Sequence, residues 1–187
     1  MKRIFWYLLG TLFVLSPVAC SSDDDAEKKV ETLDTLPANT MLYKNQKLNL
    51  ISEGTVHPHS ILFKGRTKND GDNSYEIMIP TSQIGKVIKL NDVANLKEFI
   101  LTFSSVTQGK HYGIRLYKGE NSLHAFVIDN DREEQLNDLT VLKSGHFEIL
   151  DTSQEFIIKL EFTLRNGEVV RIHARVLKSD IRKEGFS

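Results

Sequence analysis

The sequence has one cysteine, Cys20, and one tryptophan, Trp6, and both lie in its first 20 residues. The rest of the chain therefore forms no internal disulfide and offers no tryptophan ring for stacking on a sugar. The motifs G-x-S-x-G, H-E-x-x-H, G-x-x-x-x-G-K-[ST], C-x-x-C and G-x-G-x-x-G are also missing. Because the common hydrolase, metalloprotease, nucleotide-binding and redox sites need these spacings, we expect no enzymatic activity and no cofactor.

A strong excess of charge of one sign is lacking as well. The 24 basic and 25 acidic residues give a formal net charge of −1. Without residues 1–19, which contain Lys2 and Arg3, the chain keeps 22 basic and 25 acidic residues, and 22 − 25 = −3. Nucleic-acid binding depends on a basic surface, so we expect no nucleic-acid partner.

The first 19 residues have the order of a secretory signal peptide. Lys2 and Arg3 precede an apolar run from Ile4 to Val14, and small residues follow. The run is shorter than the roughly 20 apolar residues that span a membrane, which disfavours the alternative, a signal-anchor helix. The segment LSPVAC at residues 15–20 resembles the bacterial lipobox, although Pro17 and Val18 depart from that pattern. The resemblance implies cleavage before Cys20, lipidation of Cys20 and attachment to a membrane.

An acidic stretch follows the cysteine. Small polar and like-charged residues bury too little surface to fold, so residues 20–39 are predicted to form a flexible tether. The sequence CSSDDD also resembles the export signal of Bacteroidota lipoproteins, which implies an outer-membrane, surface-exposed location. The residues of this signal are Ser21, Ser22, Asp23, Asp24 and Asp25.

The clearest structural pattern runs from Glu155 to Leu177. Apolar residues alternate with polar ones on both sides of Asn166-Gly167, which predicts two strands of a β-hairpin. A three-residue loop at 165–167, with Gly167 in the left-handed conformation of a bulge, places apolar residues opposite each other. This register pairs Phe162 with Val170, Leu160 with Ile172, Ile158 with Ala174 and Glu161 with Arg171.

Shorter segments predict further hairpins. Residues 41–50 fit a hairpin that pairs Tyr43 with Leu48, and residues 98–118 fit one that pairs Phe103 with Tyr112. Residues 145–150 are predicted to join the closing hairpin with Ile149 opposite Phe156, which gives a three-stranded meander.

About ten short strands with little helix predict an all-β domain over residues 40–178, followed by a polar tail at 179–187. We favour an antiparallel β-sandwich. The alternative is a lipocalin-like β-barrel, in which an interior ligand site is expected. The order of lipobox, acidic tether, LYKNQKLNL and the closing SGHFEIL and FIIKLEFTLRNGEVVRIHARV segments resembles small Bacteroidota surface lipoproteins with an all-β domain. That resemblance brings no catalytic residues with it.

Residues with ligand chemistry are few. His57 and His59 lie two positions apart and project to one side of an extended chain, but a third ligand close in sequence is missing, so we predict no metal site there. The runs at 70–73 and 129–131 have oxygen ligands at alternate positions without the glutamate of a calcium loop, and we interpret them as turns. Tyr117 is the tyrosine predicted on a polar face, which makes it the candidate ligand contact.

The favoured hypothesis is a non-catalytic binding or accessory module at the cell surface, with a glycan or an envelope protein as partner. Its contact patch is expected at loops 69–73, 107–110 and 118–122. The alternatives are a structural subunit that assembles through edge strands and a hydrolase with two unmarked carboxylates.

Overall fold

The computed structural model describes residues 31–69, 71–96, 98–116, 123–129, 132–136 and 142–183. These residues form thirteen β-strands and short 3-10 helices. The strands are β1 (Thr40–Tyr43), β2 (Gln46–Val56), β3 (Ser60–Thr67), β4 (Asn73–Pro80), β5 (Val87–Lys89), β6 (Phe99–Ser105), β7 (Lys110–Leu116), β8 (Leu123–Asp129), β9 (Arg132–Leu136), β10 (Leu142–Asp151), β11 (Glu155–Leu164), β12 (Val169–Leu177) and β13 (Ile181–Lys183). The 3-10 helices are η1 (Thr81–Gln83), η2 (Leu90–Asn95), η3 (Val106–Gln108) and η5 (Lys178–Asp180).

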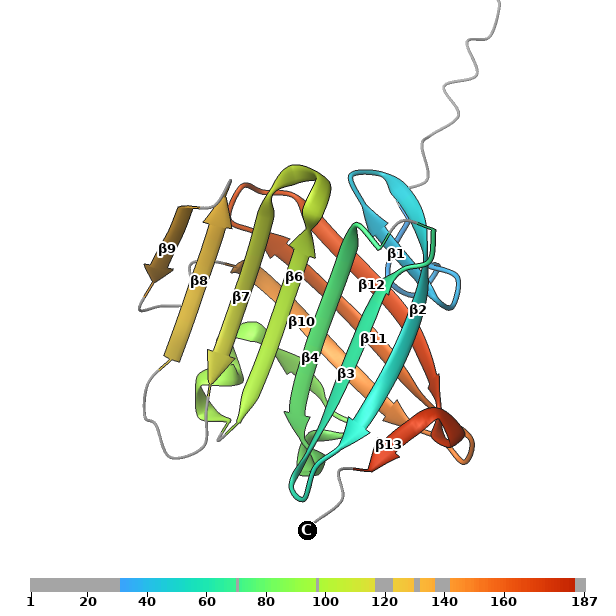
Figure 1. Cartoon of the computed structure of the whole chain (residues 1–187). Helices are drawn as coiled ribbons and strands as arrows, with labels where there is room; N and C mark the ends of the chain where they lie inside the picture. The colour runs from blue at the N-terminus through green and yellow to red at the C-terminus, as the bar shows by residue number, and fades with distance from the viewer. Residues whose placement is uncertain are drawn as a thin grey trace, which may run out of the picture. The chain divides into compact units, whose positions relative to one another are not determined.

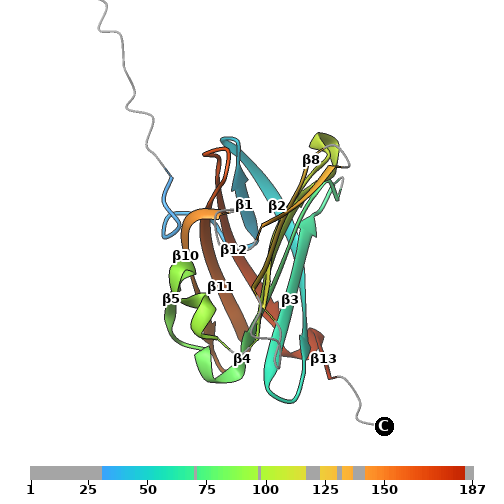
Figure 2. The same cartoon turned by 90° about the vertical axis from the view of Figure 1, so that its left-hand side faces the viewer.

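All thirteen strands belong to one sheet. Its order is β5-β10-β11-β12-β1-β2-β3-β4-β6-β7-β8-β9, with β13 added beside β2. Neighbouring strands are antiparallel, and β13 pairs parallel to β2. The sheet curls so strongly that β10, β11 and β12 lie behind β3, β4 and β6, which gives a half-barrel (Figures 1 and 2).

The predicted all-β class is confirmed, and the predicted two-sheet sandwich is wrong. The short strand β1 joins the two walls, because Met41 pairs with Ile172 of β12 on one side and with Leu48 of β2 on the other. The predicted alternative, a lipocalin-like barrel, shares the single curled sheet and the hairpin connections. Across the described residues, however, the strand order stays open from β5 to β9.

The core fills the inside of the curl. Aromatic rings from the two walls meet there: Phe99 of β6 stacks on Phe147 of β10 with centroids 5.5 Å apart. Phe103 of β6 meets Phe162 of β11 at 6.0 Å and Tyr43 of β1 at 5.0 Å, both edge to face. Burial of each large apolar side chain contributes roughly 1.5–3 kcal/mol. These contacts therefore hold the two walls of the curled sheet against each other.

The register of the β11–β12 hairpin is confirmed. All four predicted pairs are present, Gly167 has a φ of 92°, and the Glu161 Oε2 accepts a hydrogen bond from the Arg171 Nε at 2.5 Å. The predicted pairing of Phe103 with Tyr112 is also confirmed.

Two other predicted registers are wrong by two residues. Met41 and not Tyr43 lies opposite Leu48, because Lys44 and Asn45 form a two-residue turn with φ values of 50° and 60°. Ile149 lies opposite Ile158 instead of Phe156. In both hairpins the face of each residue is as predicted, since a shift of two residues leaves the faces unchanged.

The residues just before β1 pack on the polar face of β11 and β12. Leu33 and Leu36 are buried, the His173 Nδ1 lies 2.7 Å from the Leu36 carbonyl oxygen, and the Lys159 Nζ donates to the Asp34 Oδ1 at 2.9 Å. The hydrogen bond and charge of Lys159 lower the pKa of Asp34. This packed segment lies within the range 20–39 that was expected to be a tether. No helix in the described ranges is long and apolar enough to cross a membrane.

Candidate functional site

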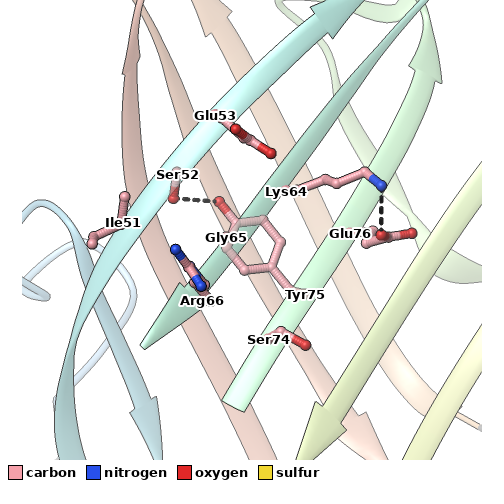
Figure 3. A pocket seen from close by; sticks show the side chains of 9 residues that line it. All are labelled: Ile51, Ser52, Glu53, Lys64, Gly65, Arg66, Ser74, Tyr75 and Glu76. Atoms are coloured by element: carbon pink, nitrogen blue, oxygen red, sulfur yellow. Dashed lines mark hydrogen bonds and ion pairs between the residues drawn. The ribbon is translucent and has the colours of Figure 1, made fainter. Parts of the chain in front are cut away.

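A hollow of about 350 Å³ lies on the outer face of β2, β3 and β4 (Figure 3). Its lining is a grid of three residues from each strand, and pairing across the strands sets them in three rows. One rim is Ile51, Arg66 and Ser74; the floor is Ser52, Gly65 and Tyr75; the other rim is Glu53, Lys64 and Glu76. We call this site the Gly65 hollow, after the residue at its centre.

The alternation of β-strand side chains explains the shape of the hollow. Residues of the two rims are exposed or half-buried, whereas Gly65 and Tyr75 of the middle row are turned to the core. Because side chains of successive residues point to opposite faces, the outer surface between the rims is backbone only. The rims are separated by two residues along each strand, which is roughly 6–7 Å.

A packed tyrosine supports the floor from inside. Tyr75 is 1% exposed, and its ring crosses Gly65 on β3 so that its hydroxyl reaches the Ser52 Oγ on β2 at 3.1 Å. A Cβ at position 65 would overlap the Tyr75 Cε1 and come within 2.8 Å of the Ser52 Oγ. Burial raises the pKa of Tyr75, against a smaller opposing effect of the Ser52 hydrogen bond. The phenol therefore stays neutral and fixes three strands relative to one another.

The two rims differ in how their charges are used. On one rim, the Lys64 Nζ pairs with the Glu76 Oε1 at 2.9 Å, and the Glu53 Oε2 lies 3.5 Å from the Arg182 Nη2 of β13. On the other rim, Arg66 is exposed and makes no ion pair within the described part of the chain. Its cross-strand neighbour Ile51 is 47% exposed. The hollow thus combines an available cation, an apolar side chain and two carboxylates with partners.

The predicted histidine pair lies in the turn between β2 and β3. His57 donates its backbone N–H to the Ser60 carbonyl oxygen at 2.9 Å, and the His59 carbonyl oxygen accepts the Thr81 N–H at 2.9 Å. Among the described residues, no group of three or more histidine, cysteine, aspartate or glutamate side chains is arranged to hold a metal ion. These backbone bonds give the segment an ordinary structural role as a turn.

Two of the three predicted ligand loops lie side by side. The Asp72 carbonyl oxygen accepts the Val106 N–H at 2.7 Å, and the Asp72 Oδ2 accepts a hydrogen bond from the Thr107 hydroxyl. Loops 69–73 and 107–110 are therefore joined by their own hydrogen bonds at one end of the half-barrel.

Other predicted positions lie outside the described residues. They are the lipidation site Cys20, the export signal Ser21, Ser22, Asp23, Asp24 and Asp25, the candidate contact Tyr117, and loop 118–122.

Sequence reasoning did not find the Gly65 hollow. The available signal was Gly65 itself, since a glycine inside a strand marks a place where another group approaches the backbone closely. Its neighbours Lys64 and Arg66 added two cations on the outer face of the same strand. The sequence did not show that Tyr75 is the group that approaches, because the two residues become neighbours only through the β3–β4 pairing.

Comparison of the chain with protein-family models, with curated proteins and with solved structures finds no match in any of the three. The chain is thus an all-β protein whose family no comparison shows.

Proposed function

We propose that the chain is a non-catalytic binding module that takes a small polar ligand in the Gly65 hollow. The observation that carries this proposal is the hollow itself, which combines exposed charged and apolar side chains above a rigid floor. Its volume of about 350 Å³ falls at the small end of the roughly 300–1,000 Å³ typical of ligand sites.

The position of the hollow in the sheet supports a preformed site. The central strand β3 pairs with β2 through seven residue pairs from Leu50↔Thr67 to Val56↔Ile61, and with β4 from Ser60↔Pro80 to Arg66↔Ser74. Side chains that stand on paired strands are held more accurately than side chains on loops. A ligand therefore meets a rim whose geometry already exists, and little ordering of the protein opposes binding.

The charges of the hollow support recognition over catalysis. Glu53 and Glu76 are each engaged by a cation, Arg182 and Lys64 respectively. The carboxylate oxygens of both residues are hydrogen-bond acceptors for a ligand. Because each carboxylate already has a cation partner, the arrangement suits a binding site and supports the proposal of a non-catalytic role.

A direct test uses two matched substitutions in the full chain. Ser74→Trp places a large side chain on the rim of the hollow, where Ser74 is half-buried, whereas Ser144→Trp places the same side chain on β10, where Ser144 is exposed. In a screen of mono- and oligosaccharides by nuclear magnetic resonance, we expect a ligand whose binding shifts the resonances of Ile51 and Arg66. Ser74→Trp should weaken that binding at least tenfold, and Ser144→Trp should leave it unchanged. A ligand that binds Ser74→Trp normally would show that the hollow is not the site.

The first 25 residues bear on the cellular location of the protein. We infer an outer-membrane, surface-exposed lipoprotein, held by lipid on Cys20 and carrying the acidic signal Ser21–Asp25, with a glycan or an envelope protein as its partner. The support is the order of residues 1–25 in the sequence. Cys20→Ser should abolish incorporation of labelled fatty acid and release the protein from the membrane fraction. Unchanged labelling would exclude Cys20 as the lipidation site.

A further inference from the structure

The Gly65 hollow has different chemistry on its two rims, and this difference indicates which ligands fit. Arg66 presents a guanidinium with no ion pair among the described residues, next to the half-buried Ser74 hydroxyl. The opposite rim presents the carboxylates of Glu53 and Glu76 on both sides of Lys64 (Figure 3). One rim therefore suits an acceptor with negative charge, and the other suits donors.

The charge of the acceptor group is limited by the same residues. A guanidinium binds a carboxylate through two parallel N–H donors, and it binds phosphate in a similar way. The hollow, however, contains two carboxylates against two cations, and Lys64 is already paired with Glu76. A doubly charged phosphate would meet one available cation and be repelled by Glu53 and Glu76. A singly charged carboxylate matches Arg66 alone.

The spacing of the rims sets the rest of the ligand. The donors that face Glu53 and Glu76 must lie across the floor from the carboxylate, at the separation of two residues along a strand, roughly 6–7 Å. The floor between them is backbone at Gly65, so that a flat, compact body fits above it. A six-membered sugar ring with a carboxylate on one side and hydroxyl groups on the other has this size and this distribution of donors and acceptors.

From these observations we propose that the Gly65 hollow binds a sugar acid, with the carboxylate on Arg66 and Ser74 and the hydroxyl groups on Glu53 and Glu76. This inference rests on the proposed binding function and adds the chemical class of the ligand. Ile51, at the end of the Arg66 rim, covers the apolar edge of the ring. Tyr75 holds the floor and positions the rims without touching the ligand through its side chain.

The test compares D-galacturonate with D-galactose, which differ by a carboxylate in place of a hydroxymethyl group. Titrations are followed by the resonances of Ile51, Lys64 and Arg66 in the full chain. We expect galacturonate to bind at least tenfold more tightly than galactose. Arg66→Gln should remove this preference, whereas Arg175→Gln on β12, where Arg175 pairs with Glu155 at 3.5 Å, should retain it. Arg66→Lys should restore part of the preference, because it keeps the charge but loses the two-donor geometry.

Each other outcome has a definite meaning. Equal binding of galactose and galacturonate at the hollow overturns the sugar-acid inference and leaves the binding function standing. Tighter binding of inorganic phosphate than of galacturonate at the same residues also overturns the inference. A preference for galacturonate that survives Arg66→Gln assigns the carboxylate to another residue and overturns the role given to Arg66. If neither these sugars nor any other compound of the saccharide screen shifts resonances of the hollow, the proposed binding function fails, and the inference fails with it.

Discussion

The β11–β12 hairpin and the β2–β3 hairpin lie on opposite walls of the half-barrel and are built differently. In β11–β12 every residue that faces the core is apolar, from Phe162 opposite Val170 to Ile158 opposite Ala174. In β2–β3 the row that faces the core includes Gly54 and the pair of Ser52 with Gly65. The β11–β12 hairpin fills the core with its own side chains. The β2–β3 hairpin leaves a space over Gly65, which the ring of Tyr75 from β4 fills.

The outer faces of the two hairpins also differ, because one is covered by another segment and the other is exposed. The segment that contains Leu33 and Leu36 packs over β11 and β12, whereas the outer face of β2 and β3 carries the Gly65 hollow. We infer that the first hairpin serves packing on both of its faces, whereas the second also carries the site. Such a division is common, because a binding surface must leave charged and apolar groups exposed that a purely structural surface would cover.

The largest expected effect comes from a cavity in the β11–β12 hairpin. Phe162 is fully buried, so Phe162→Ala should lower the free energy of unfolding by about 3–5 kcal/mol, the usual range for a buried aromatic residue. Ile51→Ala in the other hairpin should change it by less than about 0.5 kcal/mol, because Ile51 is 47% exposed. Urea unfolding followed by circular dichroism measures both. Similar losses in the two variants would contradict the proposed division.

A smaller effect is expected at the floor of the hollow. Gly65→Ala places a methyl group where the Tyr75 ring lies, and the displacement of that ring should cost about 1–3 kcal/mol. Gly54→Ala is the matched control on β2, because its nearest contacts are side-chain atoms of Ile181 and Phe63 at 3.3 Å, so that a small adjustment accommodates it. In thermal unfolding, the melting temperature of Gly65→Ala should therefore lie well below that of Gly54→Ala. The reverse order would show that Tyr75 does not depend on the glycine.

The smallest effect concerns Glu168, in the turn between β11 and β12, which contacts Tyr43 of β1. Burial alone would raise the pKa of Glu168, but hydrogen bonds from Asn166, Tyr43 and Lys44 and the charge of Lys44 lower it overall. A folded-state pKa below the unfolded value stabilises the fold above the ordinary carboxyl pKa, and this contribution is lost as pH falls through the lowered value. When the pH is lowered from 7 to 3, the free energy of unfolding of the Glu168→Gln variant should therefore fall by less than that of the wild type. Parallel losses in urea unfolding at the two pH values would exclude a contribution from Glu168.

Sequence patterns predicted which face of the sheet each residue occupies better than which residue lies opposite it on the neighbouring strand. The β11–β12 register was predictable because Gly167 marked the bulge and because Glu161 and Arg171 agreed with the apolar pairs. The turn at Lys44 and Asn45 carries no glycine, and matching apolar residues across it placed the register of β1 and β2 two residues away from the observed one. Alternation decides which face a residue occupies, and the turn decides its opposite residue.

The arrangement of the walls could not be derived in this way. A sandwich and a curled sheet need the same alternation in every hairpin, and they differ here because β1 pairs with both β2 and β12. Similarly, the charges on β3 were visible in the sequence, but their grouping with Glu53 and Glu76 required the order of β2, β3 and β4. The candidate site is a product of strand neighbours and not of one continuous motif.

The double pairing of β1 also determines how the chain reaches its folded state. The Tyr43 hydroxyl of β1 donates to the Glu168 Oε2 beside β12 across a separation of 125 residues. The backbone of β1 pairs with β12 over slightly larger separations, from Tyr43↔Val170 to Thr40↔His173. During synthesis from the N-terminus, one edge of β1 therefore has no partner until nearly the whole domain exists. Contacts this distant in sequence require a large loop to close before they stabilise anything, which slows folding. We therefore expect the two walls to join late in folding and their closure to slow the formation of the half-barrel.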